Sequence, residues 1–310
     1  MEAFGTDGTR SAHATGLLFA VGSALSFGLS GPLARGLLDA GWSTGAVVLA
    51  RVGIAALVVA PFAATALRGR WSALRRNART VVVYGAVPVV LAQFAFFQAV
   101  GKMDVGPALL IEYMAPAAVV AWIWLRHGER PSPAMLVGAA IASVGLVLVL
   151  GIFSGFHVSI VGIAWALLAM VAVATYFLLG SDVAADLPPL GLAGSGLVVG
   201  AAGLALLGAV GLLPMTAATG SPAYDGTTIA WWVPVLGLGV VTAGLAYCTG
   251  ITAIRRLGSR LASFVGLLEV VAGVAFAWLL VGQQPRPSQI VGGALVLTGI
   301  AVVKLGGRRA

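Results

Sequence analysis

Three ionisable residues, Arg51, Glu112 and Glu269, lie inside long apolar stretches of the sequence. A charged side chain is costly in such surroundings, so each of the three is a candidate functional group. A guanidinium can bind a carboxylate through two parallel hydrogen bonds, and a carboxylate can bind an ammonium group or exchange a proton. The three residue types could therefore hold a zwitterion, provided that the fold brings them together.

The composition of the chain indicates the class of protein that carries these residues. Of the 310 residues, 60% are hydrophobic and only 9% are charged, whereas a soluble domain has about 25% charged residues. Apolar runs of about 20 residues recur along the chain, and each can cross the hydrocarbon core of a bilayer. We therefore predict an all-α integral membrane protein. Loop arginines that face lipid head groups explain the net charge of +8, so no nucleic-acid partner is expected.

Charge clusters and turns rich in Gly, Pro and Ser divide the chain into ten candidate transmembrane helices. We expect these helices at 16–34, 44–66, 81–100, 105–125, 134–152, 160–180, 190–212, 231–253, 260–281 and 288–305. The first apolar run is full-length and has no small-residue cleavage site, which favours a retained helix over a signal peptide. Residues 1–15 are then a polar N-terminus and 306–310 a basic tail.

The distribution of positive charge predicts how the helices cross the membrane. One set of connecting segments holds 14 Lys and Arg residues, and the opposite set holds three. Cytoplasmic loops carry the excess of positive charge in membrane proteins. We therefore expect both termini in the cytoplasm and a multi-pass location in the inner membrane.

The chain also contains an internal repeat. A shift of 154 positions aligns 85–149 with 239–303 without a gap, and 19 of the 65 aligned residues are identical, about three times the chance expectation. The repeating unit has five helices, which is an odd number. Its two copies, 16–152 and 160–305, must therefore cross the membrane in opposite senses, as in many secondary transporters with a substrate site between the halves.

A short polar turn marks the same junction in both copies. The sequence "GERPSP" at 128–133 falls on "GQQPRP" at 282–287. We expect Glu129 to be a structural loop residue that pairs with its neighbours Arg126 and Arg130. The second copy, on the outer side, lacks that negative charge.

Helix length gives the depth of the first two buried charges. Arg51 and Glu112 each lie seven positions past the start of a helix that enters from the outer side, which is about 10 Å deep. We expect them to form an ion pair, or to hold the carboxylate and the ammonium group of a zwitterion, respectively. The alternative is a fixed structural pair that closes the outer side.

Glu269 lies about 14 Å from the cytoplasmic start of the ninth helix, near the middle of the membrane. The repeat aligns Glu269 with Ala115, which lies one helical turn from Glu112 and on the same face of its helix. Proton coupling through Glu269 or Glu112 is therefore a hypothesis. A glutamate that only holds helices together by hydrogen bonds is the alternative.

Two further groups of residues lie at helical spacings. Amide and aromatic side chains that could line a substrate site are Gln93, Tyr113, Trp122, Tyr176 and Tyr247. For a lone aromatic residue, core packing or the membrane interface is the alternative. Glycines spaced by seven predict close helix packing, or a homodimer contact, at Gly138, Gly145, Gly292 and Gly299.

Several motifs in this order resemble the EamA-type family of the drug/metabolite transporter superfamily. The matching features are Arg51, Pro116, Gly128-Glu129 and Leu268-Glu269. A further match is the run in and just after the eighth expected helix that contains Leu245, Ala246, Tyr247, Ala253 and Ile254. Gln283 and Val270 depart from the family pattern, which often has glutamate and proline there. The resemblance implies alternating-access transport of a small metabolite, often an amino acid, with export favoured and no cofactor.

Two other functional classes remain open from the residues alone. A channel-like or scaffold protein would also have many spans. An intramembrane hydrolase is suggested by "GLSG" at 28–31, which matches the short serine motif of rhomboid-type proteases. A serine nucleophile needs a nearby base, and His13, His127 and His157 all fall in loops or at span ends. We therefore predict no catalytic residue and no metal site.

Overall fold

The computed structural model describes residues 5–151, 158–182 and 187–306, with side chains from Ala14 onward except Asp182. The elements before residue 152 are α1 (Gly5–Gly28), α2 (Ser30–Asp39), α3 (Thr44–Ala66), α4 (Trp71–Arg76), α5 (Ala78–Tyr84), the π-helix η1 (Gly85–Leu91), α6 (Ala92–Val100), α7 (Val105–Glu112), α8 (Ala115–His127) and α9 (Pro133–Leu150). The later elements are α10 (Ile160–Asp182), α11 (Pro189–Ala209), β1 (Ala223–Tyr224), β2 (Thr227–Thr228), α12 (Trp232–Leu236), the π-helix η2 (Gly237–Leu245), α13 (Ala246–Gly266), α14 (Leu268–Val281) and α15 (Pro287–Gly306).

The predicted ten-helix membrane fold is confirmed. Within the described residues, nine helices are long and apolar enough to cross a membrane, and α14 is a shorter apolar helix. The expected span 44–66 coincides with α3. α1 already begins at Gly5, so most of the expected polar N-terminus is helical. The eighth and ninth spans meet at Gly258, whose backbone leaves the helical region (φ 79°, ψ 161°).

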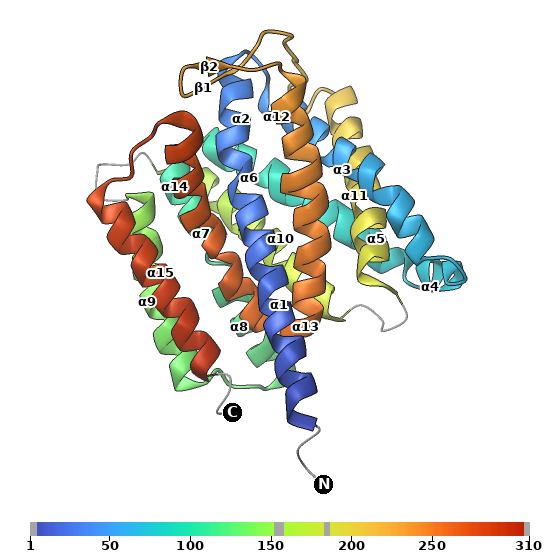
Figure 1. Ribbon diagram of the computed structural model, residues 1–310, viewed down its shortest axis with the longest axis vertical. Helices are drawn as coiled ribbons and strands as arrows, with labels where there is room; N and C mark the ends of the chain where they lie inside the picture. The colour runs from blue at the N-terminus through green and yellow to red at the C-terminus, as the bar shows by residue number, and fades with distance from the viewer. Residues whose placement is uncertain (1–4, 152–157, 183–186, 307–310) are drawn as a thin grey trace.

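The bundle has two distinct ends. α1 begins and α15 ends at the same end, which we call the terminal face, as expected for an even number of crossings (Figure 1). The antiparallel pair β1 and β2 lies at the opposite end, which we call the hairpin face (Figure 1). The connection between α8 and α9 and the bend at Gly258 in α13 lie on the terminal face, and the connection between α14 and α15 lies on the hairpin face (Figure 1).

Both halves of the chain interrupt their helices at equivalent places. η1 lies at 85–91, and the shift of 154 residues places it inside η2, at 239–245. The fourth span breaks between α7 and α8 at Tyr113 and Met114, and the ninth breaks between α13 and α14 at Leu267. Helix breaks inside a membrane bundle are tolerated where protein or a cavity satisfies the backbone. The repeat therefore extends to these irregular features.

The contact between α9 and α15 shows directly that the two halves are inverted. A Cβ added to Gly138 would lie 2.7 Å from the carbonyl oxygen of Gly299, and one added to Gly145 would lie 2.6 Å from that of Gly292. The residue number rises along one helix as it falls along the other, so the equivalent helices run antiparallel and side by side (Figure 1). The predicted close packing is confirmed. The suggestion that these glycines form a homodimer contact is wrong, because they pack against each other within one chain.

The loop before α12 is fastened to the first half of the chain on the hairpin face. The Tyr224 hydroxyl donates to the carbonyl oxygen of Leu33 at 2.6 Å, and the Trp42 indole donates to that of Ala218 at 2.7 Å. Burial raises the pKa of Tyr224 to about 12. The phenol therefore remains protonated and able to donate at physiological pH.

An ion pair joins the two halves on the terminal face. Nη2 of Arg260 lies 3.0 Å from Oε2 of Glu129 and also donates to the Glu129 carbonyl oxygen at 3.1 Å. The expected pairing of Glu129 with Arg126 and Arg130 is thus wrong. Glu129 begins the turn before α9, and Arg260 follows the bend at Gly258, so the sequence neighbours are not the spatial ones.

We predict that Gly138→Ala destabilises the protein through the α9–α15 contact. The new methyl group would overlap the backbone of α15, and overpacking of this kind costs about 1–3 kcal/mol. The thermal midpoint of the purified protein should fall. Gly22→Ala is the matched control, because a Cβ at that helical glycine meets nothing within 4 Å. Equal midpoints for the two variants would contradict the packing argument.

Candidate functional site

A large cavity lies between the two halves of the chain. Its volume is about 1100 Å³, and its walls come from α1, α2, α3, η1, α6, α7, α9, α10, α13, α14 and α15. At one end it reaches Gln283 and Gln284, which are exposed on the hairpin face. At the other end its walls are the buried residues Ala262 and Ile254. The cavity thus opens toward the hairpin face and is closed toward the terminal face.

Most of the predicted site residues line this cavity. Those that do so are Arg51, Gln93, Glu112, Tyr113, Tyr176, Tyr247 and Glu269. They come from six different spans in both halves of the chain. The fold therefore brings together the three ionisable groups that the sequence singled out.

Trp122 is the exception, and its assignment to the site is wrong. Its side chain is 52% exposed, and neighbouring Trp124 and Leu125 are exposed with it. The buried residues of α8 are Ala115, Pro116, Val119 and Val120. Trp122 therefore belongs to the outer, apolar surface of the bundle.

Arg51 does not form the predicted ion pair with Glu112. Its Nη2 donates instead to the carbonyl oxygen of Thr242 in η2, at 2.7 Å. The guanidinium carbon lies 5.6 Å from the centre of the Phe27 ring, within the range of a cation–π contact. Its Nε is buried and has no partner among the described residues. Arg51 thus retains hydrogen-bonding capacity in the wall of the cavity.

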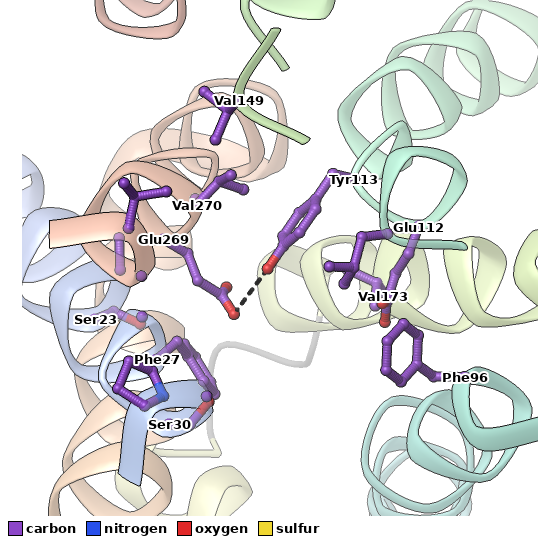
Figure 2. Close-up of a pocket in the computed structure, with 18 of the residues that line it drawn as sticks. Ser23, Phe27, Ser30, Phe96, Glu112, Tyr113, Val149, Val173, Glu269 and Val270 are labelled. Atoms are coloured by element: carbon purple, nitrogen blue, oxygen red, sulfur yellow. Dashed lines mark hydrogen bonds between the residues drawn. The ribbon is translucent and has the colours of Figure 1, made fainter. Parts of the chain in front are cut away.

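Glu269 is held by a partner from the other half of the chain. The Tyr113 hydroxyl donates to its Oε1 at 3.3 Å, and the two side chains point toward each other (Figure 2). Glu269 lies in the first turn of α14, where the helix dipole stabilises negative charge. Arg51 is close enough to Glu269 to interact electrostatically, although the two form no direct ion pair.

Glu112, unlike Glu269, lies in an environment that does not stabilise a negative charge. It is the last residue of α7, and the C-terminal end of a helix disfavours negative charge. In Figure 2 its side chain lies beside Phe96 and Val173, away from Tyr113. Within the described part of the chain it has neither a hydrogen-bond donor nor an ion-pair partner. A cation or a proton entering the cavity would satisfy it.

An aromatic cluster, made up of Phe27, Tyr176, Phe177 and Tyr247, forms one wall. The rings of Phe27 and Tyr247 meet edge to face with centroids 5.2 Å apart, and those of Tyr176 and Tyr247 do so at 5.7 Å. Sequence reasoning missed Phe27. Its spacing from Ser23 and Ser30, which also line the cavity, marks one face of the first span.

The arrangement suits binding rather than covalent chemistry. Ser30 lines the cavity, but His127 ends α8 on the exposed terminal face. The side chain of His13 and all of His157 lie outside the described residues. Among the residues described, no group of three His, Cys, Asp or Glu side chains is placed to hold a metal ion. The remaining chemistry is that of the Arg51 guanidinium, two carboxylates and an aromatic wall, with Arg286 near the mouth.

Comparison with known proteins identifies the class of membrane protein to which this fold and cavity belong. The model of the EamA-like transporter family matches residues 14–151 and again 160–305. The chain therefore belongs to the EamA-like transporter family. The two matches coincide with the two halves recognised from the repeat.

Similar proteins carry transporter names. A probable terminal-alkyne amino-acid exporter of Streptantibioticus cattleyicolor is 27% identical over 84% of this chain and 86% of its own. An aromatic amino acid exporter of Ancylobacter novellus is 27% identical over 86% and 94%, respectively. An uncharacterized inner membrane transporter of Salmonella typhimurium is 23% identical over 76% of each chain. A crystal structure with 24% identity matches 98% of both chains at a TM-score of 0.71, which supports the fold.

We predict that a water-soluble thiol reagent distinguishes the cavity wall from the outer surface. In a Cys248→Ser background, Gln93→Cys should react because the cavity is open to the hairpin face. Trp122→Cys should remain unmodified in a bilayer, because it faces lipid. Gln284→Cys, at the exposed mouth, is the positive control. Equal labelling of positions 93 and 122 would contradict the placement of the cavity.

Proposed function

We propose that this transporter exports an amino acid, or a similar amphipathic zwitterion, across the inner membrane by alternating access. The observation that carries the proposal is the meeting of Arg51, Glu112 and Glu269 in a cavity between inverted halves. Two of the similar proteins are named as amino-acid exporters, which supports both the substrate class and the direction. The name of a third supports the inner membrane.

The excess of positive charge in one set of loops supports a cytoplasmic location for the terminal face. The cavity then opens to the outside, and the contact of Arg260 with Glu129 lies on the closed cytoplasmic side. Alternating access requires the opposite state as well, in which this contact parts and the outer end closes. Spans 1–4 and 6–9 would rock around the cavity during that change.

Each cavity residue has a role in this proposal. Arg51 binds the substrate carboxylate, for which its unpartnered Nε is available. Glu112 binds the ammonium group, because it is the cavity carboxylate that has no partner among the described residues. Glu269, oriented by Tyr113, sets the charge balance of the cavity. The aromatic cluster packs against an apolar or aromatic substrate side chain, and Gln93, Tyr176 and Tyr247 supply polar contacts.

Proton exchange provides a driving force for export in the same proposal. Glu112 is the favoured carrier of the proton and Glu269 the second candidate. The charged and titratable groups near them in the cavity are Arg51, Tyr113, Tyr176 and Tyr247. A proton and a substrate ammonium group would compete for Glu112, which is the simplest form of exchange coupling.

We predict that Arg51→Lys lowers transport by at least about tenfold, since an ammonium group cannot make the bidentate contact with a carboxylate. The measurement is counterflow of radiolabelled phenylalanine in proteoliposomes that contain the purified protein. Trp122→Leu, on the lipid-facing surface, should transport at the wild-type rate. Near-normal transport by Arg51→Lys would contradict a binding role for Arg51.

We further predict that Glu112→Gln abolishes the response of transport to an imposed proton gradient, because an amide cannot carry the proton. Phenylalanine flux is measured at equal and at unequal pH across the vesicle membrane. Asp39→Asn, at the exposed end of α2, is the control and should respond as the wild type does. Unchanged responses in both Glu112→Gln and Glu269→Gln would exclude proton coupling through these residues.

A channel or scaffold is the competing function. Neither requires the cavity to close on one side, whereas this cavity is closed toward the terminal face. Counterflow of labelled substrate that saturates with concentration supports a carrier. Flux that is linear in concentration would favour a channel.

A further inference from the structure

The two π-helices of the repeat have different causes. Pro88 lies at the centre of η1, and a proline has no N–H to close the helical ladder. A wide turn is therefore built into the first half covalently. The equivalent residue in η2, 154 positions later, is Thr242, which retains its N–H. The wide turn of η2 must therefore be held by reversible contacts.

Two of these contacts involve Thr242 itself. Its hydroxyl donates back to the carbonyl oxygen of Leu238 at 2.8 Å, a local bond that bends helices. Its own carbonyl oxygen accepts the hydrogen bond from Nη2 of Arg51 at 2.7 Å. Thr242 is fully buried, and a hydrogen bond to a charged donor is among the strong ones in such a setting.

The helix that carries Arg51 is packed closely against η2. A Cβ on Gly239 would overlap the side chain of Ile54, and one on Gly244 would lie 3.4 Å from Val59. These contacts hold α3 at a fixed distance from η2 on both sides of Thr242. A change at the Arg51 guanidinium can therefore reach Thr242 without movement of α3.

We propose that the Arg51–Thr242 contact is a latch that holds η2 in its wide turn until a substrate carboxylate takes over the guanidinium. Thr242 is then a positioning residue that acts through Arg51. The proposal rests on the proposed function for its trigger but not for the latch itself. Release frees the Thr242 carbonyl oxygen, and η2 can redistribute its wide turn along the helix.

Such a change would be transmitted directly to the cavity. Tyr247 and Gly250 follow η2 in α13, and both line the cavity. A shift of the wide turn rotates these residues relative to the preceding helix, because a π-turn contains an extra residue. In the first half, Pro88 prevents the equivalent change. The two halves would thus have one fixed and one adjustable π-helix.

The first experiment is independent of any substrate. Amide hydrogen exchange is measured in nanodiscs for the segments 237–245 and 85–91. Arg51→Gln should exchange about tenfold or more faster than wild type in 237–245 only, because a hydrogen bond to a charged donor is lost. Arg51→Lys retains a donor for the carbonyl and should restore slow exchange at least partly. Unchanged exchange in Arg51→Gln would overturn the latch.

The second experiment tests the trigger with two matched compounds. Phenylalanine should accelerate exchange in 237–245 of the wild type, whereas 2-phenylethylamine, which lacks the carboxylate, should not. Equal acceleration by both compounds would overturn the carboxylate trigger. If neither compound shifts the thermal midpoint, the proposed substrate class is wrong, and the result for Arg51→Gln still decides the latch.

The third experiment transfers the proline of the first half to the second. Thr242→Pro should bind phenylalanine with the wild-type thermal shift but lose at least about ten times more transport than Thr242→Ser, because its wide turn can no longer move. Monodispersity and the thermal midpoint of the unliganded protein report whether the variant folds. Wild-type transport by folded Thr242→Pro would contradict the proposal, and a misfolded variant leaves the decision to the exchange measurements.

Discussion

A charge inside a membrane-spanning bundle must find its solvation within the protein, and this constraint organises the cavity. Arg51 is solvated by a backbone carbonyl and an aromatic ring. Glu269 is solvated by a phenol and the first turn of a helix. Glu112, at the C-terminal end of α7, has no comparable partner among the residues described. The differences in solvation among these three groups assign them different roles in the proposed transport.

The inverted repeat supplies the geometry that these charges need. It places broken helices and wide turns of both halves at equivalent positions around one cavity. The antiparallel glycine contact of α9 with α15 is nearly symmetric, since Gly138 meets Gly299, the repeat counterpart of Gly145, and Gly145 meets Gly292, the repeat counterpart of Gly138. The functional residues are not symmetric: the repeat aligns Pro88 with Thr242, and Ala115 with Glu269. Duplication thus accounts for the arrangement of the helices, and sequence divergence between the two halves accounts for the residues of the site.

Much of this helix arrangement was predictable from the sequence, because a bilayer imposes the length and composition of every span. Arg51, Glu112 and Glu269 could be found for the same reason: charges are conspicuous in apolar runs. The partner of Arg51 could not be found, since a backbone carbonyl in a π-turn has no residue-type signature. Trp122 was misplaced because every face of α8 is apolar, so the pattern does not reveal which face meets the protein and which meets lipid. Glu129 was paired with sequence neighbours because its partner Arg260 comes from the other half.

Alternating access requires the two halves to move around a cavity that binds substrate from alternate sides. The most direct test is a distance measurement between spin labels by pulsed electron paramagnetic resonance, with and without saturating phenylalanine and a proton gradient. One label pair, at Lys102 and Gln284, spans the two halves on the hairpin face, and a second, at Arg130 and Arg256, spans them on the terminal face. This movement should shorten the first distance and lengthen the second. Substrate transport with both distances unchanged would contradict it.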